Sequence, residues 1–217
     1  MEIELKYSIP DDETADKIWE NRLFSDMEEE GSREELDLLA KYYDTADRAL
    51  AKNRIAYRVR KEGDHFISTV KWQGEAEDGL HSRKELACPV PDEEPDIGIF
   101  AESDIGEELA AVVDDKPLQI LLETEVRRRR FRIDTGTAIL EVSVDQGRVK
   151  TACGEDGISE VEIELFTGDT EELVRIGKKL QKLYGLRPED TSKYIRGIRL
   201  LDAEEECAAQ SADRMRQ

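Results

Sequence analysis

Two short stretches of this chain place carboxylates on alternate residues, and both could hold a divalent cation. The first is Glu2-Ile3-Glu4-Leu5-Lys6 and the second is Glu160-Val161-Glu162. In a strand, alternate side chains share one face and lie roughly 7 Å apart. Oxygen-only sites of this kind suit Mg²⁺ or Mn²⁺, which complete their coordination with water and phosphate oxygens. The plainer interpretation of either stretch alone is an amphipathic strand whose charged face is solvated.

Basic side chains alternate in the same way on other predicted strands. Arg58 and Arg60 share one face of a strand, and Lys71 lies on a face of the next. Arginine pairs bidentately with phosphate oxygens, and lysine binds them as a compact charge. The segment 121–133 carries arginine on both faces, so spacing alone leaves open which face points inward. One face has Arg128 and Arg130, and the other has Arg127 and Arg129.

The elements that must position these residues are mostly strands with short antiparallel connections. Alternating apolar residues and turn signals predict strands at 1–7, 36–45, 55–60, 65–72, 79–87, 121–133, 137–150 and 159–166. Helical spacing predicts helices at about 10–23, 170–184 and 188–200, the last with Pro188 in its first turn. An insertion at about 88–117 contains two short helical patterns, 97–100 and 105–113.

About eight such strands are enough to close a barrel. We therefore expect an α+β fold built on an eight-stranded antiparallel β-barrel with surrounding helices. If the apolar strand faces pack outward on the helices and the insertion, the charged faces line the bore together. Clustered like charges destabilise a confined space unless counter-charges arrive. A polyanion bound together with divalent cations would balance the charges of such a bore. Because the sequence offers no positioned His or Ser nucleophile, it predicts metal-assisted hydrolysis rather than covalent catalysis.

Composition narrows the class of protein. The chain has 217 residues and a formal net charge of -20, which argues against a nucleic-acid or anionic-membrane partner. No apolar run approaches the length of a membrane span, and we expect a cytoplasmic protein. Its three cysteines are far apart and are expected to be reduced. We expect one domain over 1–201 and a frayed or disordered tail over 202–217.

Taken in order, the motifs resemble those of the CYTH superfamily, the triphosphate tunnel metalloenzymes. The matching motifs are E-x-E-x-K at 2–6, Y-Y-D-T at 42–45, R-V-R at 58–60, T-V-K at 69–71, G-L-H-S-R-K-E at 79–85, T-x-V-x-R-x-R at 124–130, L-E-x-x-x-D-x-G at 140–147, E-V-E-I-E-L at 160–165 and S-K-Y-x-R-G at 192–197. The resemblance runs from Met1 to about Leu200. It is greatest to bacterial inorganic triphosphatases, whose longer members add a helical CHAD domain that this chain is expected to lack.

The resemblance implies a tunnel that binds a linear triphosphate and Mg²⁺ or Mn²⁺. It places Arg128 and Arg130 inside and Arg127 and Arg129 outside. The implied phosphate contacts are Lys6, Arg58, Arg60, Lys71, Arg83, Arg128, Arg130 and Lys193. The implied metal ligands are Glu2 and Glu4 for a water-activating ion, and Glu160 and Glu162 for an ion that grips the substrate. Asp145 is a further implied metal ligand, although the family varies in which acid of its strand touches metal. The residues assigned to catalysis are Glu2, Glu4, Lys6 and Lys71. Ala87 departs from the pattern, because many relatives have a further glutamate there.

The expected reaction is metal-dependent hydrolysis of inorganic tripolyphosphate to pyrophosphate and phosphate by an activated water. Thiamine triphosphate or a nucleoside triphosphate remains an alternative substrate for the same tunnel. Class IV adenylate cyclase chemistry is less expected, because no His-Phe pair precedes the E-x-E-x-K motif. A non-catalytic polyphosphate binder is the third hypothesis. The expected partner is a small polyanion, with no nucleic acid and no membrane, and the apolar outer strand faces are compatible with a homodimer.

Overall fold

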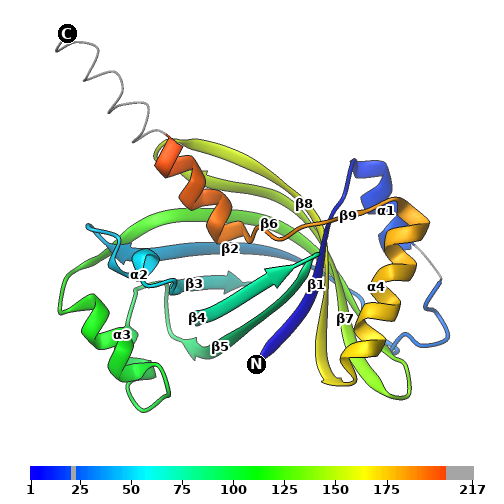
Figure 1. Cartoon of the computed structure of the whole chain (residues 1–217), viewed down its shortest axis with the longest axis horizontal. Helices are drawn as coiled ribbons and strands as arrows, with labels where there is room; N and C mark the ends of the chain where they lie inside the picture. Colours follow the sequence, from blue (N-terminus) through cyan, green and yellow to red (C-terminus); the bar gives the residue numbers. More distant parts are fainter. Residues whose placement is uncertain (21–22, 204–217) are drawn as a thin grey trace, which may run out of the picture.

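Eight antiparallel strands close into a barrel in the structure, a computed structural model that describes residues 1–20 and 23–203. The strands are β1 Glu2–Ser8, β2 Glu34–Thr45, β3 Ala56–Glu62, β4 His65–Glu77, β5 Leu80–Val90, β6 Leu118–Asp134, β7 Ala138–Thr151 and β8 Gly154–Gly168. They pair in the order β5-β4-β3-β2-β6-β7-β8-β1, and pairing of β1 with β5 closes the ring (Figure 1). The predicted eight-stranded barrel is confirmed.

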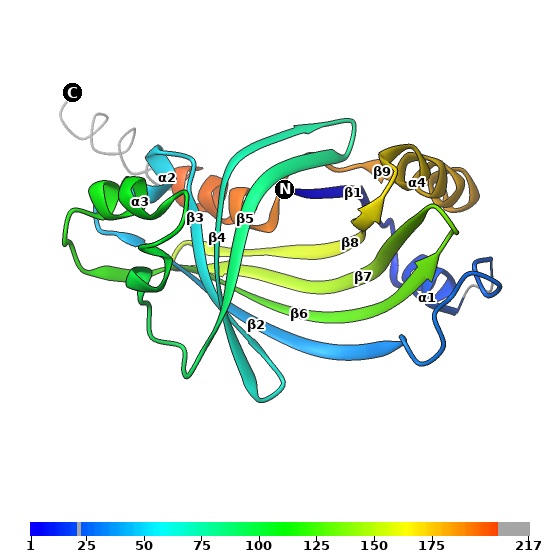
Figure 2. The same ribbon diagram turned by 90° about the horizontal axis from the view of Figure 1, so that it is seen from below.

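The helices gather at the two ends of the barrel (Figures 1 and 2). Helices α1 Asp12–Glu20 and α4 Thr170–Tyr184 lie at one end, and α2 Ala49–Lys52, the 3₁₀ helix η1 Ile97–Phe100 and α3 Gly106–Val113 lie at the other. The described part of the C-terminal segment is helical over 193–203. Among the described residues, no helix is both long and apolar enough to cross a membrane.

The outward faces of the strands carry the two larger hydrophobic cores. In the first, Leu5 and Tyr7 of β1 pack with residues of β6, β7 and β8 against Ile18 of α1 and Ile176 of α4. In the second, residues of β2 to β5 pack against η1 and α3 of the predicted insertion, where Phe100 is buried. Apolar faces thus point out toward the helices, as the alternation predicted, and the charged faces are left to the interior.

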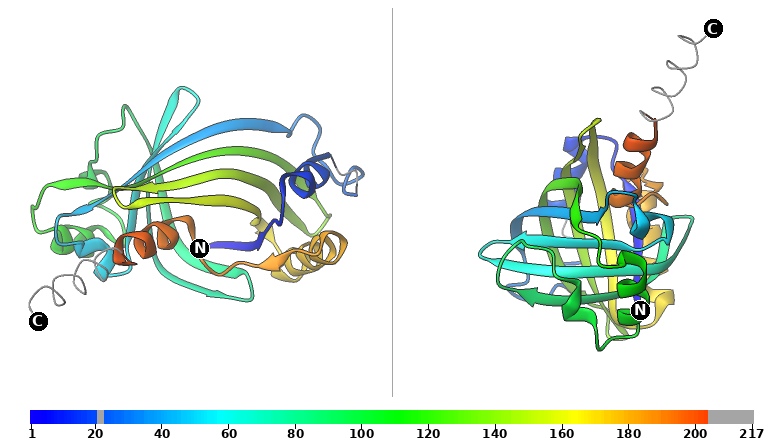
Figure 3. Two further views of the ribbon diagram at one scale, coloured as in Figure 1. Left: turned by 90° about the horizontal axis from the view of Figure 1, so that it is seen from above. Right: turned by 90° about the vertical axis from the view of Figure 1, so that its left-hand side faces the viewer.

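A third core fills part of the barrel interior. Tyr42 of β2 and Val126 of β6 pack there with Tyr194 and Ile198 of the helix 193–203. A Cβ atom on Gly197 would lie 2.5 Å from Leu122 Cδ2, so a glycine is needed for the close approach of this helix. Figure 3 shows the helix running beside β8. Apolar side chains therefore fill part of one end of the bore.

The prediction that the last helix begins at Pro188 was wrong. Arg187–Pro188 forms a short strand, β9, paired with β1, and helix begins only at residue 193. The Glu189 amide donates to the Lys6 carbonyl at 3.0 Å, which holds the segment extended along β1. Ser192 Oγ then accepts from the Ile195 amide at 3.2 Å, as a helix N-cap does. These long-range bonds override the preference of Pro188 for a first helical turn.

Two other boundaries differ from the predictions. The expected turn at 154–157 belongs to β8, because its backbone pairs with the end of β7. Helix α1 ends at Glu20 rather than near Leu23, and residues 21 and 22 lie outside the described part. The predicted tail at 202–217 also falls mostly outside the described residues, although 202 and 203 are helical.

The close packing of β7 against β6 gives a test of the fold. A Cβ atom on Gly147 of β7 would lie 2.0 Å from the Glu125 carbonyl oxygen of β6. Because backbone must move to relieve this clash, we expect Gly147→Ala to lower the free energy of unfolding by about 2–3 kcal/mol. Gly157→Ala is the matched control, since a Cβ there meets nothing within 4 Å. Chemical denaturation measures both, and equal stability of the two variants would contradict the packing.

Candidate active site

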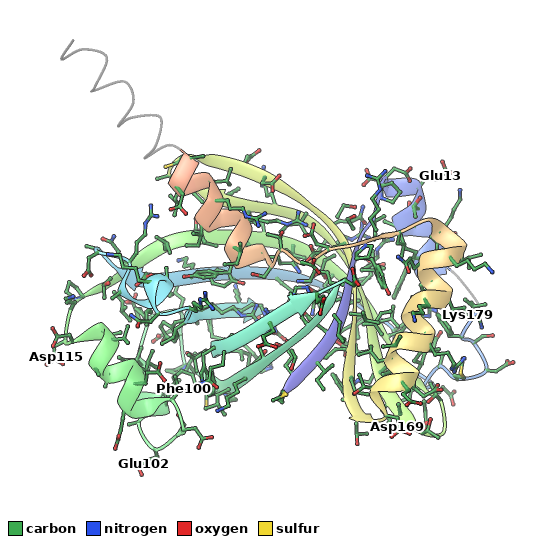
Figure 4. All side chains as sticks on the ribbon, in the orientation of Figure 1. Glu13, Phe100, Glu102, Asp115, Asp169 and Lys179 are labelled. Atoms are coloured by element: carbon green, nitrogen blue, oxygen red, sulfur yellow. The ribbon has the colours of Figure 1, made fainter. Side chains whose placement is uncertain are left out.

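A cavity of about 400 Å³ occupies the charged part of the barrel interior. Side chains from all eight strands and from the helix 193–203 line it, and most of them are charged or aromatic. Its charged lining residues are Glu2, Glu4, Lys6, Arg54, Arg58, Arg60, Lys71, Glu75, Arg83, Arg128, Asp145, Glu162, Glu164, Asp190 and Lys193. By contrast, Figure 4 places Glu13, Glu102, Asp115 and Asp169 at the periphery of the molecule. The acidic exterior therefore encloses a bore rich in bases.

The alternating face of β1 points into this cavity. Glu2 accepts from Lys71 Nζ at 2.8 Å and from Arg83 Nε at 2.5 Å. Glu4 accepts from the same Arg83, whose Nη2 lies at 2.7 Å. Lys6 is 1% exposed, and its Nζ lies 3.5 Å from Glu4 Oε1 and 3.1 Å from Glu162 Oε1. Lys6 therefore lies between the carboxylates of β1 and those of β8.

Three buried carboxylates form the most compact acidic group among the described residues. One ligand oxygen from each of Asp145, Glu160 and Glu162 lies within 4.8 Å of the others. Register explains the cluster, because Asp145 pairs with Glu160 across β7 and β8 and the alternation adds Glu162. The structure thus places Asp145 beside Glu160 and Glu162, the pair that the resemblance assigned to one metal ion.

Basic groups neutralise this cluster from three directions. Lys193 Nζ lies 2.7 Å from Asp145 and 2.5 Å from Glu160, while Arg128 binds Asp145 through both Nε and Nη2 at 2.7 Å. Burial opposes ionisation, but Lys193, Lys6 and Arg128 hold the pKa of Glu162 well below its usual range. Burial alone would lower the pKa of Lys193, yet the three carboxylates raise it well above its ordinary value. Glu162 and Lys193 are therefore both charged at neutral pH.

The arginines of β6 divide between the two faces of the strand, as the resemblance implied. Arg128 lines the cavity, and Arg130 on the same face reaches Glu141 at 3.5 Å and Glu34 at 2.8 Å. Arg127 pairs with exposed Glu35, and Arg129 pairs with Asp16 of α1. Arg130 is not among the residues that line the cavity, and its role as a phosphate contact stays a prediction.

Strand β3 has the least neutralised bases. Arg58 is half-buried, its buried Nε has no hydrogen-bond partner within the described chain, and its Nη1 reaches only Tyr42 Oη at 3.4 Å. Arg60 pairs with Glu62 of its own strand. Burial, and then the neighbouring Arg58 and Arg128, lower the pKa of Arg60 to about 10. This wall of the bore carries a surplus of positive charge and is suited to an anion.

Glu164 forms a second acidic group with Glu2 and Glu4. Register places it opposite Glu4 across β8 and β1, and it lines the cavity. Burial, and then the charges of Glu2 and Glu4, raise the pKa of its carboxyl to about 7. A cation near these three acids would relieve the repulsion between them.

Sequence reasoning assigned no role to three residues of the site. Glu164 continues the alternation of Glu160 and Glu162, so its place could have been found from spacing. Glu85 pairs with Lys71, and although burial opposes it, Lys71 and Arg58 lower its pKa to about 2. Arg196 donates to Glu160 at 3.2 Å and to Glu189 at 2.8 Å, which ties the C-terminal helix to β8. Glu85 and Arg196 both lie within the motifs of the resemblance, but only the fold shows which carboxylates and bases they contact.

Comparison with known proteins agrees with this geometry. A family model described as the CYTH domain matches residues 1–198. The chain belongs to the CYTH domain family. An inorganic triphosphatase of Haemophilus influenzae is 29% identical over 137 residues, which are 61% of this chain and 37% of that protein. The chain thus spans well under half the length of this curated relative.

Solved structures share the barrel of this CYTH domain. A candidate adenylyl cyclase from Hippeastrum with a dominant triphosphatase activity superposes with a TM-score of 0.63 at 20% identity, covering 90% of this chain and 95% of that one. The mimivirus capping enzyme triphosphatase gives a TM-score of 0.51 at 12% identity, covering 82% of this chain and 87% of that one. At these identities the likeness shows the fold alone.

The donor set of this CYTH domain fits a hard divalent cation. The compact cluster offers carboxylate oxygens only, and it is fully buried. Such oxygen sites suit Mg²⁺ or Mn²⁺ rather than softer metals, which prefer nitrogen or sulfur. Within the described residues, lysine and arginine side chains balance the charge of the cluster, as a bound cation would.

The raised pKa of Glu164 predicts a pH-dependent stability. Its carboxyl ionises near pH 7 when folded but near its ordinary value of 4.5 when unfolded. The folded state therefore binds more protons between these values, and the free energy of unfolding falls as pH rises from about 4.5 to about 7. We expect Glu164→Gln to raise the free energy of unfolding at pH 8 by about 1–3 kcal/mol and to change it little at pH 4.5.

Urea denaturation at both pH values, without divalent metal, measures this effect. Glu102→Gln in the exposed turn before α3 is the control and should be neutral at either pH. A Glu164→Gln variant that is less stable at pH 8 than the wild type would contradict the repulsion among the three acids.

Proposed function

We propose that this CYTH domain hydrolyses a linear triphosphate with the help of divalent cations, and that inorganic tripolyphosphate is its preferred substrate. The observation that carries the proposal is the opposition of two walls in one cavity. Carboxylates of β1, β7 and β8 converge on one side, and the surplus bases of β3 lie on another. The similarity to an inorganic triphosphatase supports the same reaction.

The bases of the chain would bind and orient the phosphates. Arg58 is the readiest contact, because its guanidinium is buried and has no carboxylate partner among the described residues. Arg60 and Arg128 flank it, and Lys6, Lys71, Arg83 and Lys193 can each transfer from a carboxylate to a phosphate oxygen. Several fixed charges on one chain of phosphates hold the reacting phosphorus in line and stabilise the charge that develops on its oxygens.

The acids of the chain would hold the cations. We assign Asp145, Glu160 and Glu162 to one ion, and Glu2 and Glu4, with Glu164 beside them, to a second. Bound there, Mg²⁺ or Mn²⁺ would polarise the phosphoryl oxygens and lower the pKa of an attacking water. Lys6 lies between these two groups of carboxylates. Its ammonium could therefore neutralise a phosphate that lies between the two cations while it stays close to both groups. The apolar side chains of Tyr194 and Ile198 exclude bulk water from part of one end of the bore.

The proposed role of β1 is tested by a change that removes one charge without changing shape. We expect Glu4→Gln to lower kcat for Mg²⁺-dependent phosphate release from tripolyphosphate by roughly 100-fold, because one water-activating ligand is lost. EDTA should abolish the wild-type activity. Glu107→Gln, on the exposed side of α3, is the charge-matched control and should retain wild-type rates. Wild-type kcat in Glu4→Gln would remove the proposed role of β1 in catalysis.

A second candidate substrate is an organic triphosphate. Tyr42 and Tyr194 stack with ring centroids 5.5 Å apart, and Leu38, Val126 and Ile198 extend the lining with apolar surface. A nucleoside or a thiamine group could contact this surface, whereas inorganic tripolyphosphate has no apolar group that could do so. We expect kcat/KM for tripolyphosphate to exceed that for ATP and thiamine triphosphate by at least about tenfold. A higher value for either organic substrate would reverse the assignment, and release of cyclic AMP from ATP would indicate cyclase chemistry.

A further inference from the structure

Arg54 differs from the other bases that line the cavity. Its side chain is exposed at the cavity rim, and it forms no hydrogen bond or ion pair within the described chain. Every other lysine and arginine of the lining reaches a carboxylate or, for Arg58, a tyrosine hydroxyl. An unpaired guanidinium at the opening of an anion site is free to bind an anion.

The backbone of Arg54 is also unusual. Its φ is 57°, in the left-handed region that glycine and asparagine adopt far more readily than arginine. The position follows Asn53 at the end of α2, where the chain turns into β3, and the turn itself requires only a residue that tolerates this conformation. Arginine is therefore unfavourable for the backbone conformation at this position. Its presence there favours a role for its side chain.

Arg54 extends a row of bases along one strand. Arg58 and Arg60 share the inward face of β3, and the small side chain of Ala56 lies on the same face between Arg58 and Arg54. Arg58 and Arg60 are also the inward bases with the least carboxylate neutralisation. An anion that follows the least neutralised wall of the bore would run along β3 and emerge beside Arg54.

The cavity lining also includes two exposed acidic side chains. These are Glu75 of β4 and Asp190, which accepts from the Gly79 amide at 2.6 Å. Their charges would repel an emerging phosphate, whereas the charge of Arg54 would attract it.

We propose that Arg54 is a chain-length determinant, which contacts the phosphate beyond the third of a linear polyphosphate whose inner phosphates lie along Arg58 and Arg60. The assignment rests on the proposed function for the identity of the substrate. It extends that function from triphosphate to tetraphosphate and longer chains, for which Arg54 supplies a contact that a triphosphate does not reach. Arg54 acts by binding, so its effect should appear in KM and Kd rather than in kcat.

The test uses the full chain and the variant Arg54→Asn, which suits the left-handed backbone without the charge. We expect Kd for tetrapolyphosphate, measured by calorimetry with Mg²⁺ in a Glu4→Gln background that slows turnover, to rise about 10-fold, while Kd for tripolyphosphate rises less than about 2-fold. With Mg²⁺, KM should follow the same pattern at unchanged kcat. Because asparagine fits this conformation better, the melting temperature should stay equal to that of the wild type or rise. A merely structural arginine would instead lower it.

Lys52→Gln is the control, because it removes an exposed positive charge two residues away that is not part of the cavity lining. It should leave both Kd values unchanged. An equal loss of affinity for both chain lengths in Arg54→Asn would overturn the proposal, as would no loss at all, or a loss confined to ATP. The calorimetric measurement needs no turnover, so it tests Arg54 even if the wild type hydrolyses none of these compounds and the proposed function fails.

Discussion

The buried ammonium of Lys6 between two groups of carboxylates is the interaction on which the rest of the site depends. A lysine that is 1% exposed is costly unless counter-charges surround it, and here Glu4 and Glu162 supply them. Those carboxylates in turn need Arg83, Arg128 and Lys193. Each charge is tolerated only because its neighbours are present, so the bore forms one network rather than a set of independent pairs.

This network explains why the hydrophobic core lies outside the barrel. A small barrel ordinarily fills its bore with apolar side chains. Here the bore holds charges, so the strands use their outward faces for packing and need helices α1, α3 and α4 to cover them. The helix 193–203 provides the remaining apolar filling at one end and also delivers Lys193 to the acidic cluster. Packing and charge balance thus depend on the same segment.

The distribution of charge also bears on the choice of ligand. A chain with a net charge of -20 would repel polyanions at its surface, yet its cavity gathers bases whose partners can be exchanged. A cation and an anion that enter together preserve neutrality, because carboxylates take the cation and bases take the anion. Either one alone would leave buried charges without partners, which is costly. The proposed function therefore requires cooperative binding of the metal ion and the phosphate chain.

Much of the fold was determined by local sequence. Alternation of apolar and charged residues, which has the two-residue period of a strand, identified the eight strands. Apolar residues at helical spacing identified helix 170–184 and the two short helices of the insertion. The same alternation grouped Glu2 with Glu4 and Glu160 with Glu162. Composition and motif order then led to the CYTH family, which the family match confirms.

Only the tertiary structure decided which groups meet. Both faces of β6 carry arginine, and the inward face is fixed by the pairing of β6 with β2 and β7, not by its own sequence. The start of the last helix was set by bonds from Lys6 and Gly79 to residues 189 and 190, each more than 100 positions away. The contacts of Glu85 and Arg196, and the free guanidinium of Arg54, likewise depend on neighbours distant in sequence. Periodicity assigns a residue to a face, but the closure of the barrel determines what that face meets.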